Sequence, residues 1–282
     1  MSVNFKQKRI INQIRAAALN FLFPSKCILC SAFINSEDNR YDILTKPIPD
    51  SKNLVNLFEK IIKLYVCKDC IEELKPVRPP ICPVCGEMFQ SMADDNHLCK
   101  RCIKTDRNFT KARAGGVYTG ILKSLIHQLK YGEKITAAKP LSVFLFYSYL
   151  KFFKEKDFDY ITPLPLHIKK AKKRGFNQSY FLVKYWGKIA KNFKIKIPEI
   201  RLNIIEKQKN TPSQAGLSAN KREKNIKNSF AVKDANKVCG KSFLIIDDVV
   251  TTGATIDECA KVLKKAGARK VEALSLARSI VL

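Results

Sequence analysis

The chain has 282 residues and is 46% hydrophobic, which is enough to bury a proper core in one α/β domain with a smaller module beside it. It carries 52 lysines and arginines against 25 aspartates and glutamates, a formal net charge of +27 that attracts polyanions such as nucleic acids. A lysine-rich surface that only faces water is the alternative, and no stretch is long and apolar enough to predict a membrane span.

Residues 1–24 begin with a basic stretch and continue with an apolar one. No small-x-small cleavage site follows, because the next residues are Pro24, Ser25 and Lys26, so a signal peptide is not predicted. We expect an amphipathic helix packed on the body of a cytoplasmic protein.

Eight of the ten cysteines form four Cys-x2-Cys pairs within the segment 25–108. The pairs are Cys27/Cys30, Cys67/Cys70, Cys82/Cys85 and Cys99/Cys102. A gap of two residues lets both thiolates of a pair point at one metal ion, and two pairs complete a tetrahedral Zn²⁺ shell. We expect a zinc-ribbon module that holds one or two structural Zn²⁺ ions.

Spacing alone leaves the pairing of these cysteines open. Disulfides compete with zinc, although they are rare in the cytoplasm. An interleaved pairing or an unmetallated site also fits the spacing. His97 lies two residues before Cys99 and offers a further ligand, but we expect a surface histidine there. Cys259 falls on the apolar face of a predicted helix and is expected in the core.

The segment 109–282 alternates predicted strands and helices, which favours an α/β domain with a parallel sheet. Strands are expected at Ala114–Tyr118 and Tyr160–Leu164, and helices at Ile121–Lys130, Leu141–Phe153 and Tyr180–Ala190.

A basic turn is predicted at residues 167–179, directly after the second of these strands. Its cations are Lys169, Lys170, Lys172, Lys173 and Arg174. A basic loop that contains glycine and follows a strand is suited to closing over a pyrophosphate. The alternative is a helix start whose charges face water. Farther along, residues 208–230 predict an irregular or partly helical flap, with Lys221 and Arg222 as its anion contacts.

The most informative stretch is Phe243–Thr255, with the sequence FLIIDDVVTTGAT. Four apolar residues predict a buried parallel strand, and Asp247 and Asp248 follow at its carboxyl end. A turn rich in threonine and glycine then leads into a helix that ends at Gly267, and residues 270–277 predict the next strand. The backbone N–H groups of such a turn suit a phosphate, and the carboxylates suit sugar hydroxyls or a divalent cation. The pattern predicts a ribose 5-phosphate site.

This run resembles the phosphoribosyl-pyrophosphate (PRPP) signature of type I phosphoribosyltransferases, in which four hydrophobic residues and two acids precede a Thr-Gly-x-Thr loop. The resemblance implies that PRPP binds with Mg²⁺, with Asp247 and Asp248 on the ribose hydroxyls. It assigns the 5-phosphate to Thr251, Thr252, Gly253, Ala254 and Thr255. Members that act on 6-oxopurines have a general acid/base aspartate where Thr251 stands here, and a threonine cannot do that work. Hypoxanthine or guanine salvage is therefore not expected.

Further motifs resemble the ComF family of competence-associated, phosphoribosyltransferase-like proteins, and they cover nearly the whole chain. In order, they are LNFLFPSKC before the first cysteine pair, LKYGE, the Pro-Leu-Pro run into KKRGFNQ, the pattern Thr211, Gln214, Arg222, Asn225 and Phe230, and the PRPP loop. The resemblance implies a type I phosphoribosyltransferase-like parallel sheet flanked by helices, with a small N-terminal cysteine-rich zinc-ribbon module. It also implies a role with internalised single-stranded DNA in natural transformation, beside competence helicase or channel proteins.

Two hypotheses of function follow. In the first, the protein handles single-stranded DNA through its cationic groups and through stacking on Phe176, Tyr180, Tyr185 and Trp186, and the PRPP site is regulatory or vestigial. In the second, it is a working phosphoribosyltransferase: Asp247 and Asp248 hold PRPP, and Arg174 stabilises the departing pyrophosphate. No catalytic acid stands out for the second hypothesis, for which Glu133 or a substrate-derived base would have to serve. An adaptor that binds only proteins is a third possibility.

Overall fold

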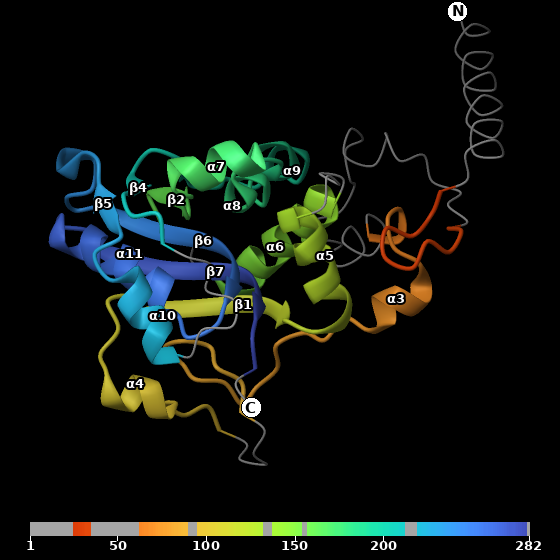
Figure 1. Ribbon diagram of the computed structural model, residues 1–282, viewed down its shortest axis with the longest axis horizontal. Helices are drawn as coiled ribbons and strands as arrows, with labels where there is room; N and C mark the ends of the chain where they lie inside the picture. Colours follow the sequence, from red (N-terminus) through yellow and green to blue (C-terminus); the bar gives the residue numbers. More distant parts are fainter. Residues whose placement is uncertain are drawn as a thin grey trace, which may run out of the picture.

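The computed structural model describes residues 25–34, 62–89, 95–131, 137–153, 157–211 and 219–280, without the side chains of residues 219, 220 and 222 (Figure 1). The helix predicted at residues 1–24 lies outside these ranges, as do Gln214 and Glu133.

A parallel sheet forms the centre of the described part of the chain (Figure 1). Its strands are β1 (Lys111–Val117), β2 (Tyr160–Pro163), β3 (Glu199–Ile200), β6 (Ser242–Val250) and β7 (Lys270–Arg278). They lie in the order β1-β7-β6-β2-β3, and every neighbouring pair is parallel. An antiparallel pair, β4 (Ile205–Lys207) and β5 (Phe230–Val232), stands apart from this sheet. The predicted α/β fold with a parallel sheet is confirmed.

Helices cover both faces of the sheet (Figure 1). The described helices are α3 (Lys68–Glu72), α4 (Lys100–Lys104), α5 (Gly120–Tyr131), α6 (Ala138–Phe152), α7 (Ile168–Arg174), α8 (Gln178–Phe181), α9 (Trp186–Asn192), α10 (Ala219–Ile226) and α11 (Ala254–Lys265), with a 3₁₀ turn at Ala235–Lys237. The helices predicted at Ile121–Lys130 and Leu141–Phe153 are confirmed as α5 and α6. The single helix predicted at Tyr180–Ala190 is wrong, because tight i to i−3 hydrogen bonds from Val183 and Trp186 separate α8 from α9.

The side chains of the central strands alternate between two separate cores. On β6, Leu244 and Ile246 pack in the core beneath α5, α6, α8 and α9, whereas Phe243 and Ile245 pack in the core that contains the apolar face of α11. This alternation is expected for a strand buried on both faces. Cys259 lies in the α11 core, as predicted, and is fully buried.

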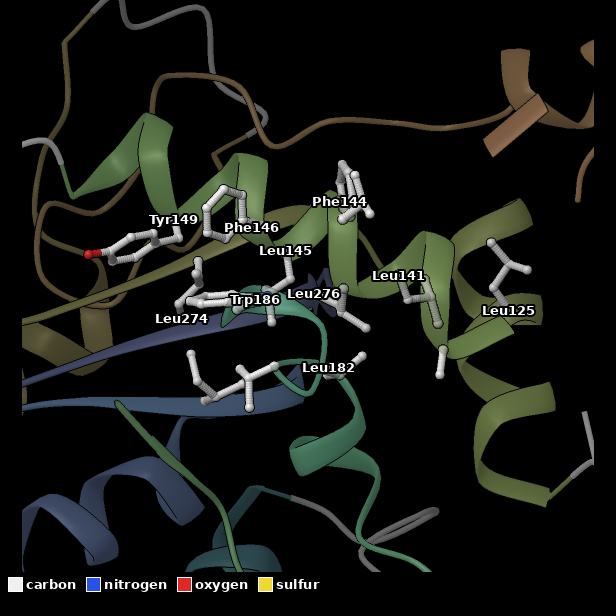
Figure 2. Packing of buried hydrophobic residues seen from close by; sticks show 14 of the residues in the cluster. Leu125, Leu141, Phe144, Leu145, Phe146, Tyr149, Leu182, Trp186, Leu274 and Leu276 are labelled. Carbon is white, nitrogen blue, oxygen red and sulfur yellow. The ribbon is translucent and has the colours of Figure 1, made fainter. Parts of the chain in front are cut away.

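The α6 core is rich in aromatic residues (Figure 2). Trp186 is fully buried there, edge-on to Phe146 with a centroid distance of 5.3 Å, and its indole N–H donates to the carbonyl of Ser142 at 3.1 Å. The prediction that Trp186 stacks on nucleic-acid bases is therefore wrong. Leu182 at the end of α8 and Trp186 at the start of α9 both pack into this core, on either side of the break between the two helices. Phe176, Tyr180 and Tyr185 also pack against this core, but they are partly buried.

The two cysteine clusters belong to different cores, the wide one beside α5 and the compact one on the α11 side of the sheet. Cys27 belongs to the core of α5 and α6, whereas Cys82, Cys85, Cys99 and Cys102 belong to the core of α11. The chain that connects the clusters runs along the outer edge of β1, where the N–H of Val117 donates to the carbonyl of Lys75 at 2.8 Å. This segment therefore covers the β1 edge of the sheet.

Among the described helices, none has both the length and the apolar character that crossing a bilayer requires.

Candidate functional site

The eight paired cysteines form two clusters of four. Cys27, Cys30, Cys67 and Cys70 make the wide cluster, and Cys82, Cys85, Cys99 and Cys102 make the compact cluster. Within each cluster the sulfur atoms lie within 4.8 Å of one another, so the pairing is sequential and not interleaved. The Sγ atoms of Cys85 and Cys99 are 3.6 Å apart, too far for a disulfide and close to the separation of about 3.8 Å in a tetrahedral shell with Zn–S bonds of about 2.3 Å. Both clusters fit a structural Zn²⁺ ion.

His97 is not part of the compact cluster. Its ring is exposed and stacks on Phe89 with a centroid distance of 3.8 Å, while its Nδ1 lies 3.1 Å from the carbonyl oxygen of Asp95. The prediction of a surface histidine is confirmed. With four thiolates, neither cluster keeps an open coordination position, which indicates a structural role.

A buried arginine ties the compact cluster to the sheet. Arg278, at the end of β7, donates to the carbonyl of Cys85 at 2.6 Å and lies 3.5 Å from its sulfur. The same guanidinium contacts Glu87 at 3.4 Å, and Glu87 accepts a hydrogen bond from Arg101 at 2.8 Å. Gly86 is required beside it, because a Cβ there would lie 2.7 Å from the carbonyl oxygen of Ala112. The cluster is therefore docked on β1 and β7.

The two aspartates lie inside β6, just beyond the end of β2. Pro163 of β2 pairs with Ile246, whereas β6 continues beside β7 until Val250 pairs with Arg278. The prediction that the strand ends at Ile246 is too short, since the run Val249–Val250 still has a neighbour in β7. The carboxyl edge next to β2 nevertheless begins at Asp247, as the sequence pattern indicates.

Asp248 has a partner that the sequence pattern did not reveal. The ammonium of Lys130, at the end of α5, lies 2.8 Å from Asp248 Oδ2. Burial opposes the charge of this ammonium, but the carboxylates of Asp248 and Asp247 outweigh burial and raise the pKa of Lys130. Lys130 belongs to the LKYGE motif, which could have drawn attention to it, although the motif assigns no role to this lysine.

Asp247 lies in a setting that disfavours its charge. Burial raises the pKa of its carboxyl, and the charge of Asp248 adds to this effect, whereas Lys130 partly offsets it. Its Oδ1 accepts a hydrogen bond from the backbone N–H of Asp248 at 2.8 Å. A cation or hydroxyl donors beside Asp247 would favour the ionised form.

Residues Thr251–Gly253, here called the phosphate turn, connect β6 to α11. Gly253 has φ 81° and caps the amino end of α11, and the N–H of Ala254 donates to Thr252 Oγ1 at 3.3 Å. Thr255 is in the first turn of the helix. The arrangement of strand, turn and helix is the predicted one, and the amino end of α11 directs backbone N–H groups and a positive dipole toward the turn.

The basic segment after β2 is a helix, α7, and not the predicted turn. The ring of His167 caps it by accepting from the N–H of Lys169 at 3.3 Å, and Gly175 ends it with φ 78°. Lys169, Lys172 and Lys173 are exposed on this helix, whereas Lys170 and Arg174 are partly buried. For three of the five cations, the structure therefore agrees with the alternative interpretation, in which the segment starts a helix and its charges face water.

Arg174 and Lys170 are the two partly buried cations of α7. The guanidinium of Arg174 lies over the ring of Tyr131 at 5.6 Å and donates to Gln178. Arg174 therefore contacts the end of α5, the helix whose Lys130 pairs with Asp248.

Lys207 of β4 is a second residue that the sequence pattern missed. Burial lowers its pKa, and the nearby charge of Lys170 lowers it further. Two cations that repel each other near Asp247 would gain from an anion between them. The predicted flap, residues 208–230, is helical at α10 (Ala219–Ile226); Lys221 is exposed, and Arg222 has no described side chain.

Two family models match the chain. The model of the phosphoribosyl transferase domain matches residues 183–280, and the model of the double zinc ribbon domain matches residues 62–103. Among solved structures, a glutamine PRPP amidotransferase from B. subtilis aligns with a TM-score of 0.33 at 15% identity, over 53% of this chain and 30% of that one. So weak a superposition adds nothing to the assignment.

Curated relatives match along most of their length. Competence protein F of Haemophilus influenzae is 29% identical over 223 residues, which cover 78% of this chain and 93% of that protein. DNA utilization protein YhgH of Escherichia coli K12 is 30% identical over 227 residues, or 76% of this chain and 91% of that protein. Competence protein ComFC of Bacillus subtilis is 25% identical over 90% of this chain and 95% of that protein. The chain therefore belongs to the ComF family, whose double zinc ribbon and phosphoribosyltransferase domain it contains.

Proposed function

We propose that this protein handles single-stranded DNA in natural competence and binds PRPP with Mg²⁺ at the carboxyl edge of its sheet. The observation that carries the proposal is the place of α7. Three exposed lysines lie on a helix that begins shortly after β2 ends, at the edge where Asp247 and Asp248 lie. The names of the relatives, competence protein F and DNA utilization protein, support the same role.

The proposed PRPP site uses both ends of the β6–α11 connection. Asp247 and Asp248 would take the ribose hydroxyls together with Mg²⁺, which supplies charge neutralisation for the pyrophosphate when bound. Thr251, Thr252, Gly253, Ala254 and Thr255 would take the 5-phosphate. Arg174 beside α5, with Lys170 and Lys207, would face the pyrophosphate.

The proposed DNA contacts combine charge with one exposed ring. Lys169, Lys172 and Lys173 would follow the phosphates, and Tyr131, whose side chain is 63% exposed beside Arg174, offers a stacking surface. Lys170 and Arg174 complete the basic set near the sheet.

The proposal includes a cytoplasmic location, as the family resemblance implies, and competence helicase or channel proteins as partners. It divides the chain into an N-terminal helix (1–24), a double zinc-ribbon module (25–108) and a phosphoribosyltransferase-like domain (109–282).

Fluorescence anisotropy of a labelled thymidine oligonucleotide, measured over a series of salt concentrations, tests the DNA role. The variant K169E/K172E/K173E is expected to bind about tenfold or more weakly, with a shallower salt dependence, because phosphate contacts are lost. The control K151E/K237E/K265E changes the net charge equally at exposed lysines on other elements and is expected to retain most of the affinity. Equal losses in both variants would contradict a DNA surface at α7.

Pyrophosphate release from PRPP, assayed with and without nucleobases and single-stranded DNA, separates the two hypotheses from the sequence. Acceptor-dependent release that disappears in Asp248→Asn would establish a phosphoribosyltransferase. Binding of PRPP without release would leave a regulatory site.

A further inference from the structure

The compact zinc cluster and the phosphate turn are joined by hydrogen bonds at both ends of the turn. The compact ribbon, defined here as the described residues of the segment 81–108, carries Cys82, Cys85, Cys99 and Cys102 and continues into Arg107 and Asn108. The bonds made by these two residues and by Arg278 connect the ribbon to the loop proposed to hold the phosphate.

At the far end of the turn, Arg107 fixes a peptide group. Its Nη2 donates to the carbonyl of Thr252 at 3.3 Å. Because a trans peptide is planar, its C=O and its N–H point in opposite directions. A carbonyl held toward the ribbon therefore directs the N–H of Gly253 to the other side of that peptide. Phe109, buried to 2% exposure, lies beneath, since a Cβ on Gly253 would lie 3.8 Å from its Cζ.

Asn108 fixes the first turn of α11. Its backbone N–H donates to Asp257 Oδ1 at 2.8 Å, and its side-chain amide donates to Oδ2 at 3.1 Å. Both oxygens of one carboxylate are thus held by one residue of the ribbon. Asp257 is also bonded through its own N–H to the carbonyl of Gly253 at 2.9 Å. The helix start and the turn therefore form one hydrogen-bonded unit with Asn108.

At the near end, the contact runs through β7. Arg278 donates to the carbonyl of Cys85, and the N–H of the next residue, Ser279, donates to the carbonyl of Val250 at 2.9 Å. Val250 is the residue before the phosphate turn. The ribbon therefore reaches the turn from both directions, whereas the wide cluster packs beside α5 and makes no such contact among the described residues.

We propose that Arg107 and Asn108 are positioning residues of the phosphate turn, and that they make its geometry depend on the compact zinc cluster. The biological meaning of this inference rests on the proposed PRPP function. The coupling of the compact zinc cluster to the backbone of the phosphate turn does not depend on that function. An ordered ribbon holds the N–H groups of the turn in one arrangement before ligand arrives. Loss of zinc from the compact cluster releases Arg107 and Asn108, and the turn loosens.

Hydrogen exchange of the Ala254 and Asp257 amides, which donate to Thr252 Oγ1 and to the carbonyl of Gly253, tests the bonds when measured on the zinc-loaded full chain without ligand. Asn108→Asp puts two carboxylates together, and it is expected to speed exchange about tenfold, because bonds to a charged group are lost. The double variant N108D/D257N restores a carboxylate–amide pair with the roles exchanged and is expected to recover slow exchange. Asn203→Asp, at an exposed asparagine, is the matched control and is expected to have no effect. Equal exchange in N108D and wild type would overturn the proposal, as would a double variant no slower than N108D.

The zinc arm compares the two clusters. Cys99→Ser in the compact cluster is expected to speed exchange at Ala254 and Asp257, whereas Cys70→Ser in the wide cluster leaves it within about twofold of wild type. Equal effects of both substitutions would overturn the link to the compact cluster. Calorimetric titration of the same proteins with PRPP and Mg²⁺ reports separately on function. If wild type binds no PRPP, the proposed function fails, and the exchange result still decides the coupling.

Discussion

The ammonium of Lys130 lies 2.8 Å from the Oδ2 atom of Asp248, and their side chains are only 20% and 5% exposed. This ion pair joins the end of α5 to the centre of the sheet. It allows a carboxylate to lie inside β6 without an uncompensated charge. It also means that a ligand which engages Asp248 meets a residue already balanced by a cation.

Substitution of Lys130 by methionine is expected to lower the free energy of unfolding by about 3 kcal/mol, because it leaves Asp248 buried without its counter-charge. Urea denaturation measures the loss. The double variant K130M/D248N is expected to regain part of it, and Lys123→Met, at an exposed position of the same helix, should change little. A K130M protein as stable as K123M would show that the pair does not stabilise the fold.

Substitution of Arg278 by methionine is expected to weaken zinc retention in the compact cluster by about 10- to 100-fold, as is usual for residues that support metal ligands from outside the coordination shell. Arg278 is 4% exposed and contacts both the carbonyl and the sulfur of Cys85. Competition with a chromogenic chelator measures the change. Arg269→Met, at an exposed arginine, is the control, and equal zinc release from both variants would rule out this role.

Gly253 and Gly187 form a matched pair for backbone strain. Gly253 has φ 81°, and Gly253→Ala is expected to cost about 1–2 kcal/mol of stability and to weaken PRPP binding, although a Cβ has room there. Gly187 lies within α9, where an added Cβ would meet no other atom within 4 Å, and Gly187→Ala is expected to add up to about 1 kcal/mol. Thermal unfolding distinguishes the two, and a neutral Gly253→Ala would contradict the strained turn.

Asp159 provides a pH-dependent contribution to stability. The backbone N–H of Ser242 donates to its Oδ2 at 2.8 Å, and this bond, with the charge of Lys241, lowers the pKa of Asp159 below its ordinary value despite some burial. A lowered folded-state pKa stabilises the fold above the unfolded-state pKa, and the gain disappears as the pH falls through the folded-state value.

Asp159→Asn is therefore expected to cost about 1 kcal/mol at neutral pH and almost nothing once the pH is below the folded-state pKa, after allowance for partial exposure. Urea denaturation at several pH values measures this. Asp157→Asn, at an exposed carboxylate 3.4 Å from Arg269, is the control and should have little effect at any pH. A pH-independent loss in Asp159→Asn would contradict the assignment.

The sequence predicted those features that depend on residues close together in the chain. The β6–α11–β7 unit follows from four apolar residues, a small-residue turn and a helical repeat whose Cys259 is buried as expected. The cysteine pairs predicted the metal clusters, because ligand spacing is a short-range signal, although their sequential pairing needed the fold.

The rest depended on long-range contacts. Lys130 and Asp248 are far apart in sequence, and nothing in a single sequence joins them. The ring of Trp186 suits either base stacking or burial, and only its packing against α6 shows that it belongs to the core. The run of lysines in α7 favoured a basic loop in the sequence, but the segment is a helix that His167 caps at its start and Gly175 ends. The bonds of Arg107 and Asn108 to the phosphate turn carry no sequence signature.

Calorimetric titration of the zinc-loaded protein with PRPP and Mg²⁺ tests the central claim most directly. We expect saturable binding that is lost in D247N/D248N, while D157N/D234N, which changes the charge equally at other acidic residues, still binds. Absence of binding by the wild type, or equal binding by all three proteins, would contradict a PRPP site at the carboxyl edge of the sheet.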